Sequence, residues 1–256
     1  MLDWLHAHTL LPANGWILLL ALCGAMCIGL SKSGLAGTAT LNVVLMAQIF
    51  GAKPSVGLVL PMLIVADLLG YLMNRQGGSW RQILPMMPPA IAGVVVGWLL
   101  LDRIDNAVAR VVIGWIILGL LAFNLVLRRR RAQFLALTEH RAFAQGMGFL
   151  AGAVTMIANA AGPVMTVFLL SQRLEKREHL GVFCRFFLFI NLFKLPFSGS
   201  LGLVTGKSLM TNLVLLPGVI AGILLGWQIL KRIKQDAFES VLAWLTAFAA
   251  LWLIVG

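Results

Sequence analysis

Charged side chains are scarce in this 256-residue chain, of which they make up 11%, against about 25% in an average soluble domain. Apolar residues make up 60% of the chain, and the mean hydropathy is +0.94. A water-soluble fold needs more polar surface than this composition provides, which excludes a soluble enzyme, a disordered chain and a fibrous protein. The composition predicts an all-α polytopic membrane protein that lies in a lipid bilayer.

Groups that enzymes use for catalysis are also scarce. The chain has four histidines and three cysteines. Every histidine falls at a terminus or in a predicted loop, and every cysteine falls inside an apolar run with no histidine or acid nearby. The zinc-protease, Walker A and dinucleotide-binding patterns are missing from the sequence. We therefore expect no enzyme activity, no metal and no cofactor.

Acidic residues are outnumbered by basic ones, 9 against 20, which gives a net charge of +11. The basic residues stand in short groups between apolar runs, so they indicate membrane topology and do not predict nucleic-acid binding. Placing the four arginines at 128–131 in the cytoplasm also puts most other basic residues there. We expect a bacterial inner-membrane protein whose 128–141 loop is cytoplasmic and whose two termini are periplasmic.

Apolar segments divide the chain into about eight to ten membrane crossings. Two segments, 38–51 and 163–172, are shorter than the roughly 20 residues that a full crossing needs. Each follows a stretch of glycine and other small residues, at 31–37 and 158–163. The short segments are either half-helices of broken hairpins or short full crossings. The complete set of apolar segments is 14–30, 38–51, 55–74, 83–101, 107–127, 142–158, 163–172, 180–198, 209–230 and 237–255.

The second half of the chain repeats the first. A block with Pro88, Gly93, Gly97 and Trp98 recurs at a constant spacing as Pro217, Gly222, Gly226 and Trp227. This match predicts two membrane repeats, 1–131 and 132–256, each opening with a glycine-broken helix hairpin. The loop at 102–105 is neutral whereas its partner at 231–234 carries three basic residues, so we expect the repeats to be inverted. Inverted repeats are typical of secondary transporters.

Four ionisable residues fall within or beside the apolar segments, where charge is costly and therefore indicates function. Asp67 aligns with Asn191 of the second repeat; it either carries a coupling proton or forms a structural pair with that asparagine. Arg185 and Lys194 either lie on an anion path or extend to the membrane edges. Lys32, at the first glycine break, either attracts an anion or marks the cytoplasmic side.

The two glycine breaks predict an anion site. Helix N-termini that meet at membrane depth present free N–H groups and the positive ends of their dipoles. Nearby hydroxyl and amide groups can add hydrogen bonds. The alternative is that the glycines only join two ordinary short helices. The expected substrate-binding residues are Ser33, Gly34, Gly37, Thr38, Thr40, Asn42, Asn159, Gly162, Arg185 and Lys194, with Asp67 and Asn191 as the coupling residues.

Segments 29–37 and 152–163, together with the two Pro…Gly-x-x-x-Gly-Trp blocks, resemble the sulfite exporter TauE/SafE family. The resemblance covers nearly the whole chain. It implies a secondary transporter that exports a small anion, sulfite or an organosulfonate, using a proton or ion gradient. A passive anion channel and a non-transporting membrane protein, such as a lipid-handling enzyme, are the alternatives. The Gly-x-x-x-Gly pairs either allow a homodimer or pack the two repeats together.

Overall fold

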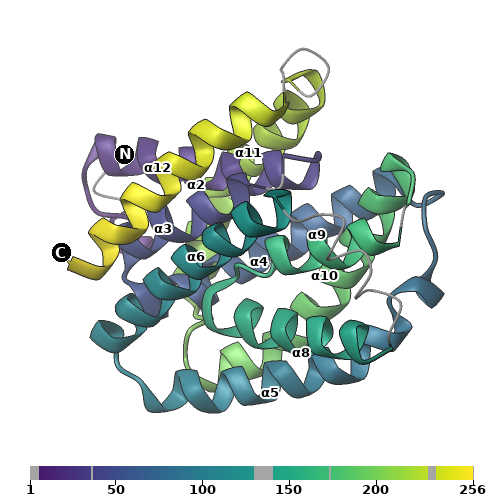
Figure 1. The fold of residues 1–256 in the computed structure, drawn as a ribbon. Helices are drawn as coiled ribbons and strands as arrows, with labels where there is room; N and C mark the ends of the chain where they lie inside the picture. The colour runs from purple at the N-terminus through teal and green to yellow at the C-terminus, as the bar shows by residue number, and fades with distance from the viewer. Residues whose placement is uncertain (1–5, 36, 130–140, 173, 230–234, 256) are drawn as a thin grey trace.

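The computed structural model of the protein describes residues 6–35, 37–129, 141–172, 174–229 and 235–255 (Figure 1). The regular elements in these ranges are all helices, which confirms the all-α prediction. Two short 3-10 helices, η1 (Trp80–Gln82) and η2 (Leu84–Met86), precede α5. In chain order the α-helices are α2 (Gly15–Lys32), α3 (Thr38–Phe50), α4 (Ala52–Met73), α5 (Met87–Arg103), α6 (Asn106–Arg129), α8 (Arg141–Ala158), α9 (Gly162–Ser171), α10 (Lys176–Ser200), α11 (Gly206–Ile229) and α12 (Gln235–Val255).

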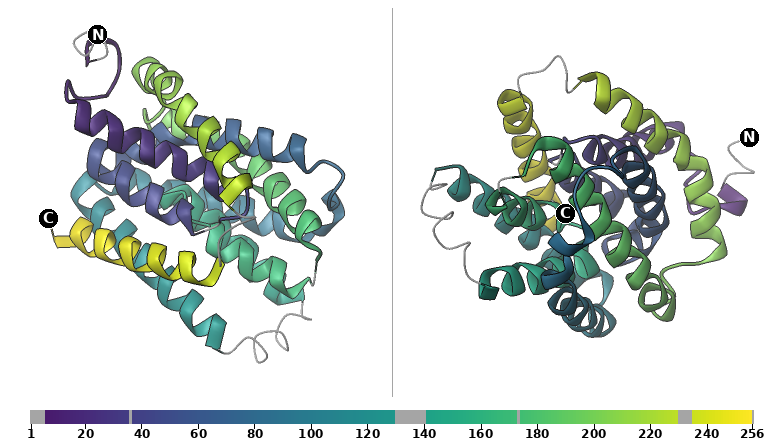
Figure 2. Two further views of the ribbon diagram at one scale, coloured as in Figure 1. Left: turned by 90° about the horizontal axis from the view of Figure 1, so that it is seen from above. Right: turned by 90° about the vertical axis from the view of Figure 1, so that its right-hand side faces the viewer.

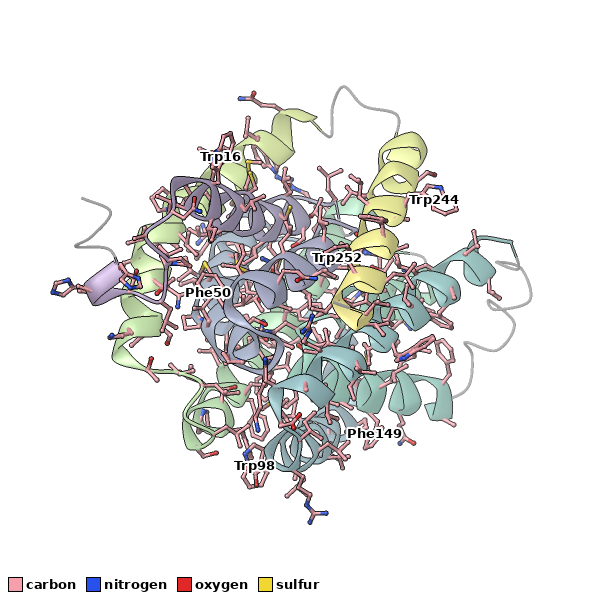
Figure 3. The ribbon with its side chains drawn as sticks, turned by 90° about the vertical axis from the view of Figure 1, so that its left-hand side faces the viewer. Trp16, Phe50, Trp98, Phe149, Trp244 and Trp252 are labelled. Atoms are coloured by element: carbon pink, nitrogen blue, oxygen red, sulfur yellow. The ribbon has the colours of Figure 1, made fainter. Side chains whose placement is uncertain are left out.

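The helices form a bundle with an apolar outer surface. Six of those in the described residues are long and apolar enough to cross a membrane, and three shorter apolar helices accompany them. Trp16 and Trp244 are 76% and 78% exposed, and both lie at the rim of the bundle in Figure 3. Exposed aromatic and aliphatic side chains on this scale suit contact with lipid. The protein is therefore a multi-pass membrane protein, as the composition predicts.

Both glycine breaks interrupt the helices where the sequence predicts. Helix α2 ends at Lys32 and α8 ends at Ala158. The chain then passes through a left-handed backbone conformation at Gly34, with φ of 116°, and at Asn159, with φ of 54°. Glycine and asparagine tolerate this conformation better than other residues do, and it cannot continue a right-handed helix. The short helices α3 and α9 follow directly.

The two halves of the chain pack against each other through matched pairs of helices. Helix α5 of the first half packs along α8 of the second, and α11 of the second packs along α2 of the first. Helices α4 and α10 pack together at the centre, as the views in Figure 2 also show. A pseudo-two-fold relation between the halves predicts such reciprocal packing, in which each half supplies one helix to each pair. The division at residue 131 and the inverted orientation stay predictions.

The Gly-x-x-x-Gly pairs lie inside these contacts between the halves. A Cβ atom added at Gly97 would lie 2.9 Å from the Cβ of Met156 on α8. One added at Gly222 would lie 2.9 Å from the carbonyl carbon of Met26 and 3.1 Å from the Cα of Gly29, both on α2. Small residues allow helix backbones to approach this closely. The glycines therefore pack the two halves together, which confirms the second of the two roles expected for them. A homodimer, the first of those roles, stays a prediction.

The first and last helices place their outer ends on the same side of the bundle. The start of α2 and the end of α12 lie on the same side of the bundle in the left view of Figure 2, although well apart. That both termini face the same compartment stays a prediction. Which compartment that is stays a prediction, because residues 130–140 of the arginine-rich loop and the basic loop at 231–234 lie outside the described residues.

Candidate functional site

A cluster of buried polar side chains lies where α2, α4, α8 and α10 meet. Lys32 ends α2, Asp67 lies within α4, and Asn191 and Lys194 lie one turn apart on α10. The four side chains are buried, with Asp67 and Lys194 fully enclosed. Polar groups in an apolar interior are costly unless they are paired. The cluster therefore depends on its internal contacts, which run continuously from the first glycine break to the second.

The first part of the cluster is an ion pair. Lys32 Nζ lies 2.6 Å from Asp67 Oδ1, and the Asn191 amide donates a hydrogen bond of 2.8 Å to Asp67 Oδ2. Lys32 Nζ also lies 5.2 Å and 4.6 Å from the ring centroids of Phe183 and Phe187, close enough for cation–π attraction. The Asp67–Asn191 contact expected from the aligned repeats is present. Neither interpretation of Lys32 included this ion pair.

The second part of the cluster surrounds Lys194. Its Nζ donates to the backbone carbonyl of Thr155 at 2.6 Å, to the Thr155 hydroxyl at 3.3 Å, and to the amide oxygens of Asn159 at 2.6 Å and Asn191 at 3.4 Å. All four acceptors are neutral. Lys194 forms no ion pair within the described residues. Lys194 is therefore held by dipoles and has no carboxylate as a counter-ion.

Asn159 connects Lys194 to a narrow crevice between α3, α4 and the end of α8. Its Oδ1 accepts from Lys194, and its Nδ2 donates to the Val56 carbonyl at 2.8 Å. The crevice brings together Asn42 and Asn159, which are both predicted site residues from different halves of the chain. Its lining consists of Asn42, Val43, Met46, Ser55, Val56, Val59, Ala158 and Asn159.

Most hydroxyl and amide groups at the first break bond to nearby backbone. Ser33 donates to the Leu30 carbonyl at 2.8 Å, and Thr40 donates to that of Gly37 at 2.8 Å. Thr38 contacts two carbonyls, Cys27 at 2.9 Å and Leu35 at 2.8 Å, while Asn42 Nδ2 donates to Gly24 at 2.8 Å. Gly34 and Gly37 lie in the turn before α3, and Gly162 begins α9. In this conformation these contacts stabilise the break.

Arg185 lies away from the crevice, nine residues before Lys194 on α10, which is about 13 Å along the helix axis. Its guanidinium donates to the carbonyls of Gly77 and Arg75, the second at 2.6 Å. The Cζ atom lies 5.1 Å from the ring centroid of Tyr71. Arg185 is buried within the protein, and both roles expected for it, on an anion path or at the membrane edge, stay predictions. It holds the connection after α4 against the start of α10.

The sequence interpretation missed two kinds of residue in this site. Thr155 precedes Asn159 by one helical turn in an otherwise apolar run, and that spacing was the available signal for it. Phe183 and Phe187 are indistinguishable in sequence from ordinary packing residues. The described residues contain no group of three or more histidine, cysteine or acidic side chains that could hold a metal ion.

Comparison with known proteins identifies the family. The model of the sulfite exporter TauE/SafE family matches residues 17–253, which is nearly the whole chain. Curated proteins and solved structures give no significant match. The family match includes both glycine breaks and all the residues of the buried cluster. The chain therefore belongs to the sulfite exporter TauE/SafE family of membrane transporters.

Proposed function

We propose that the protein is a secondary transporter that exports a small anion, sulfite or an organosulfonate, across the bacterial inner membrane, using a proton or ion gradient. The observation that carries this proposal is Lys194, a buried lysine whose hydrogen-bond partners are all neutral and which lies next to a crevice between the two halves. A buried charge of this kind is costly. An anion bound nearby would supply the missing counter-charge.

The substrate site that we propose is this crevice, which leaves no room for a water molecule in the present conformation and must therefore widen before an anion can enter. The Asn42 and Asn159 amides would contact the anion, and Lys194 would supply positive charge through its contact with Asn159. Ser33, Gly34, Gly37, Thr38, Thr40 and Gly162 would contribute when movement of α3 and α9 releases their present backbone contacts. Arg185 would act as a positioning residue, because carbonyls already occupy its guanidinium.

Asp67 is the proposed coupling residue. It is an acid at the centre of the protein, bound by Lys32 and Asn191. Protonation of Asp67 would remove the charge that holds Lys32, so proton binding would weaken a contact between α2 and α4. Asn191, its partner in the second half, would keep the carboxylate oriented.

The test is anion flux in proteoliposomes under an imposed proton gradient, with radiolabelled sulfite and methanesulfonate as probes. We expect saturable flux that increases with the gradient, and we expect Asp67→Asn to remove the dependence on the gradient. Asp102→Asn, which removes an exposed acid at the end of α5, is the matched control. Unchanged gradient dependence in Asp67→Asn would show that the coupling role is wrong. Flux that neither saturates nor responds to the gradient would favour the passive channel.

A further inference from the structure

The centre of the bundle contains more basic than acidic side chains. Lys32 and Lys194 are the two basic residues of this cluster, and Asp67 is the acid that contacts it in the described residues. Because Lys32 and Asp67 pair directly at 2.6 Å, their charges cancel. With both lysines protonated, the cluster therefore has one positive charge in excess, and this charge is at Lys194. The buried Arg185 is bound by carbonyls at the far end of the helix segment and belongs to a separate contact.

We infer that the site selects ligands with a single negative charge, and that the Lys32–Asp67 pair determines this selectivity by neutralising the second cation. This inference rests on the proposed function and specifies its substrate class. A monoanion in the crevice, which Asn159 separates from Lys194, brings the buried cluster to neutrality. A dianion leaves one uncompensated negative charge in an apolar interior, where it cannot recover its hydration energy.

The chemistry of the ligands follows from this charge balance. Simple alkylsulfonates such as methanesulfonate carry one negative charge at neutral pH, and hydrogensulfite does as well. Sulfate and fully deprotonated sulfite carry two. The site should therefore take alkylsulfonates with one net negative charge and hydrogensulfite, and reject sulfate, although the tetrahedral groups are similar in size. Neutral amide donors such as Asn42 and Asn159 contribute hydrogen bonds without changing the charge that the site accepts.

Methanesulfonate and sulfate are the matched probes, because they have similar shapes and differ by one charge. Binding is measured on the purified protein by calorimetry at neutral pH and constant ionic strength. We expect the wild-type protein to prefer methanesulfonate by roughly tenfold or more, the size expected for one extra unit charge at short range in a partly buried site. Asp67→Asn leaves both lysines unmatched, so the preference should shift towards sulfate by a similar factor.

Two further variants keep the test independent of the folding of Asp67→Asn. The double variant Lys32→Gln/Asp67→Asn removes the ion pair as a unit and should keep the wild-type preference. Asn159→Asp places a carboxylate at the position of an atom that lies 2.6 Å from Lys194 Nζ, and aspartate tolerates the left-handed backbone there. This internal counter-ion should replace the ligand and reduce methanesulfonate binding at least tenfold. Asp102→Asn is again the control and should leave both affinities unchanged.

The outcomes separate this inference from the proposed function. A wild-type protein that binds both probes equally, or an Asp67→Asn variant with the wild-type preference, would overturn the selectivity mechanism and leave anion transport in place. Full methanesulfonate binding by Asn159→Asp would do the same. A wild-type protein that neither binds nor transports any sulfonate, sulfite or sulfate would overturn the proposed function, and the inference with it.

Discussion

The contact between α2 and α11 gives a sharp prediction about how the two halves of the protein are held together. Gly222 faces Met26 and Gly29 so closely that an added Cβ would lie 2.9 Å from the carbonyl carbon of Met26 and 3.1 Å from Gly29 Cα. These neighbours are backbone atoms, which cannot rotate away as a side chain can. Gly222→Ala must therefore move one helix away from the other and lose dispersion contacts along their shared length.

We expect Gly222→Ala to lower the free energy of unfolding by about 1–3 kcal/mol, the usual cost of overpacking an interior. Gly119→Ala is the matched control. Gly119 lies within α6, and a Cβ atom there would meet nothing within 4 Å. Because alanine favours the helix over glycine by about 1 kcal/mol, this control should leave stability unchanged or raise it.

The measurement is unfolding of the purified protein in mixed micelles, with the two variants and the wild-type protein compared under identical conditions. Gly93→Ala should behave like Gly222→Ala, since Gly93 faces the Phe149 carbonyl on α8 in the matching contact of the other half. Equal stability of Gly222→Ala and Gly119→Ala would refute the close packing of α2 and α11.

Two other predictions concern single side chains. Asn159→Gly keeps the left-handed backbone and removes the amide between Lys194 and the crevice. Sulfonate affinity, measured by calorimetry, should fall about tenfold, and the free energy of unfolding should fall by roughly 1 kcal/mol. Wild-type affinity in this variant would contradict a role for the amide. Arg185→Lys replaces a planar group that reaches two carbonyls with a point charge. The free energy of unfolding in micelles should fall by about 1–3 kcal/mol, while the preference between methanesulfonate and sulfate stays unchanged. A changed preference would place Arg185 in the substrate site instead.

Local chemistry explains why the helix breaks could be predicted from the sequence. Glycine and other small residues that follow a long apolar run mark the end of a helix, and the structure ends α2 and α8 close to these positions. The contact between Asp67 and Asn191 could be predicted for a different reason. Equivalent positions near a pseudo-two-fold axis lie close together, so the alignment of the two repeats is itself a distance prediction.

The partners of the lysines could not be predicted, because they depend on tertiary packing. Lys32 stands at the end of an apolar run, where hydropathy cannot distinguish a membrane-edge lysine from a buried one. The structure buries it because α4 and α10 cross beside the end of α2. Lys194 depends in the same way on the carbonyl and hydroxyl of Thr155, and neither group has a sequence pattern that indicates a lysine partner.

The ion pair and the dipole-bound lysine together suggest why this centre contains two cations and one acid. Asn191 contacts both parts, since its Nδ2 donates to Asp67 and its Oδ1 accepts from Lys194. A change in the charge of Asp67 therefore reaches Lys194 through one side chain as well as through the electric field. Proton binding at Asp67 would raise the positive charge of the cluster by one and strengthen anion binding, whereas proton release would weaken it. Because the proton and the anion would bind together, a transporter built on this cluster would move both in the same direction. In the flux assay, a proton gradient directed out of the vesicle should therefore drive export of the anion.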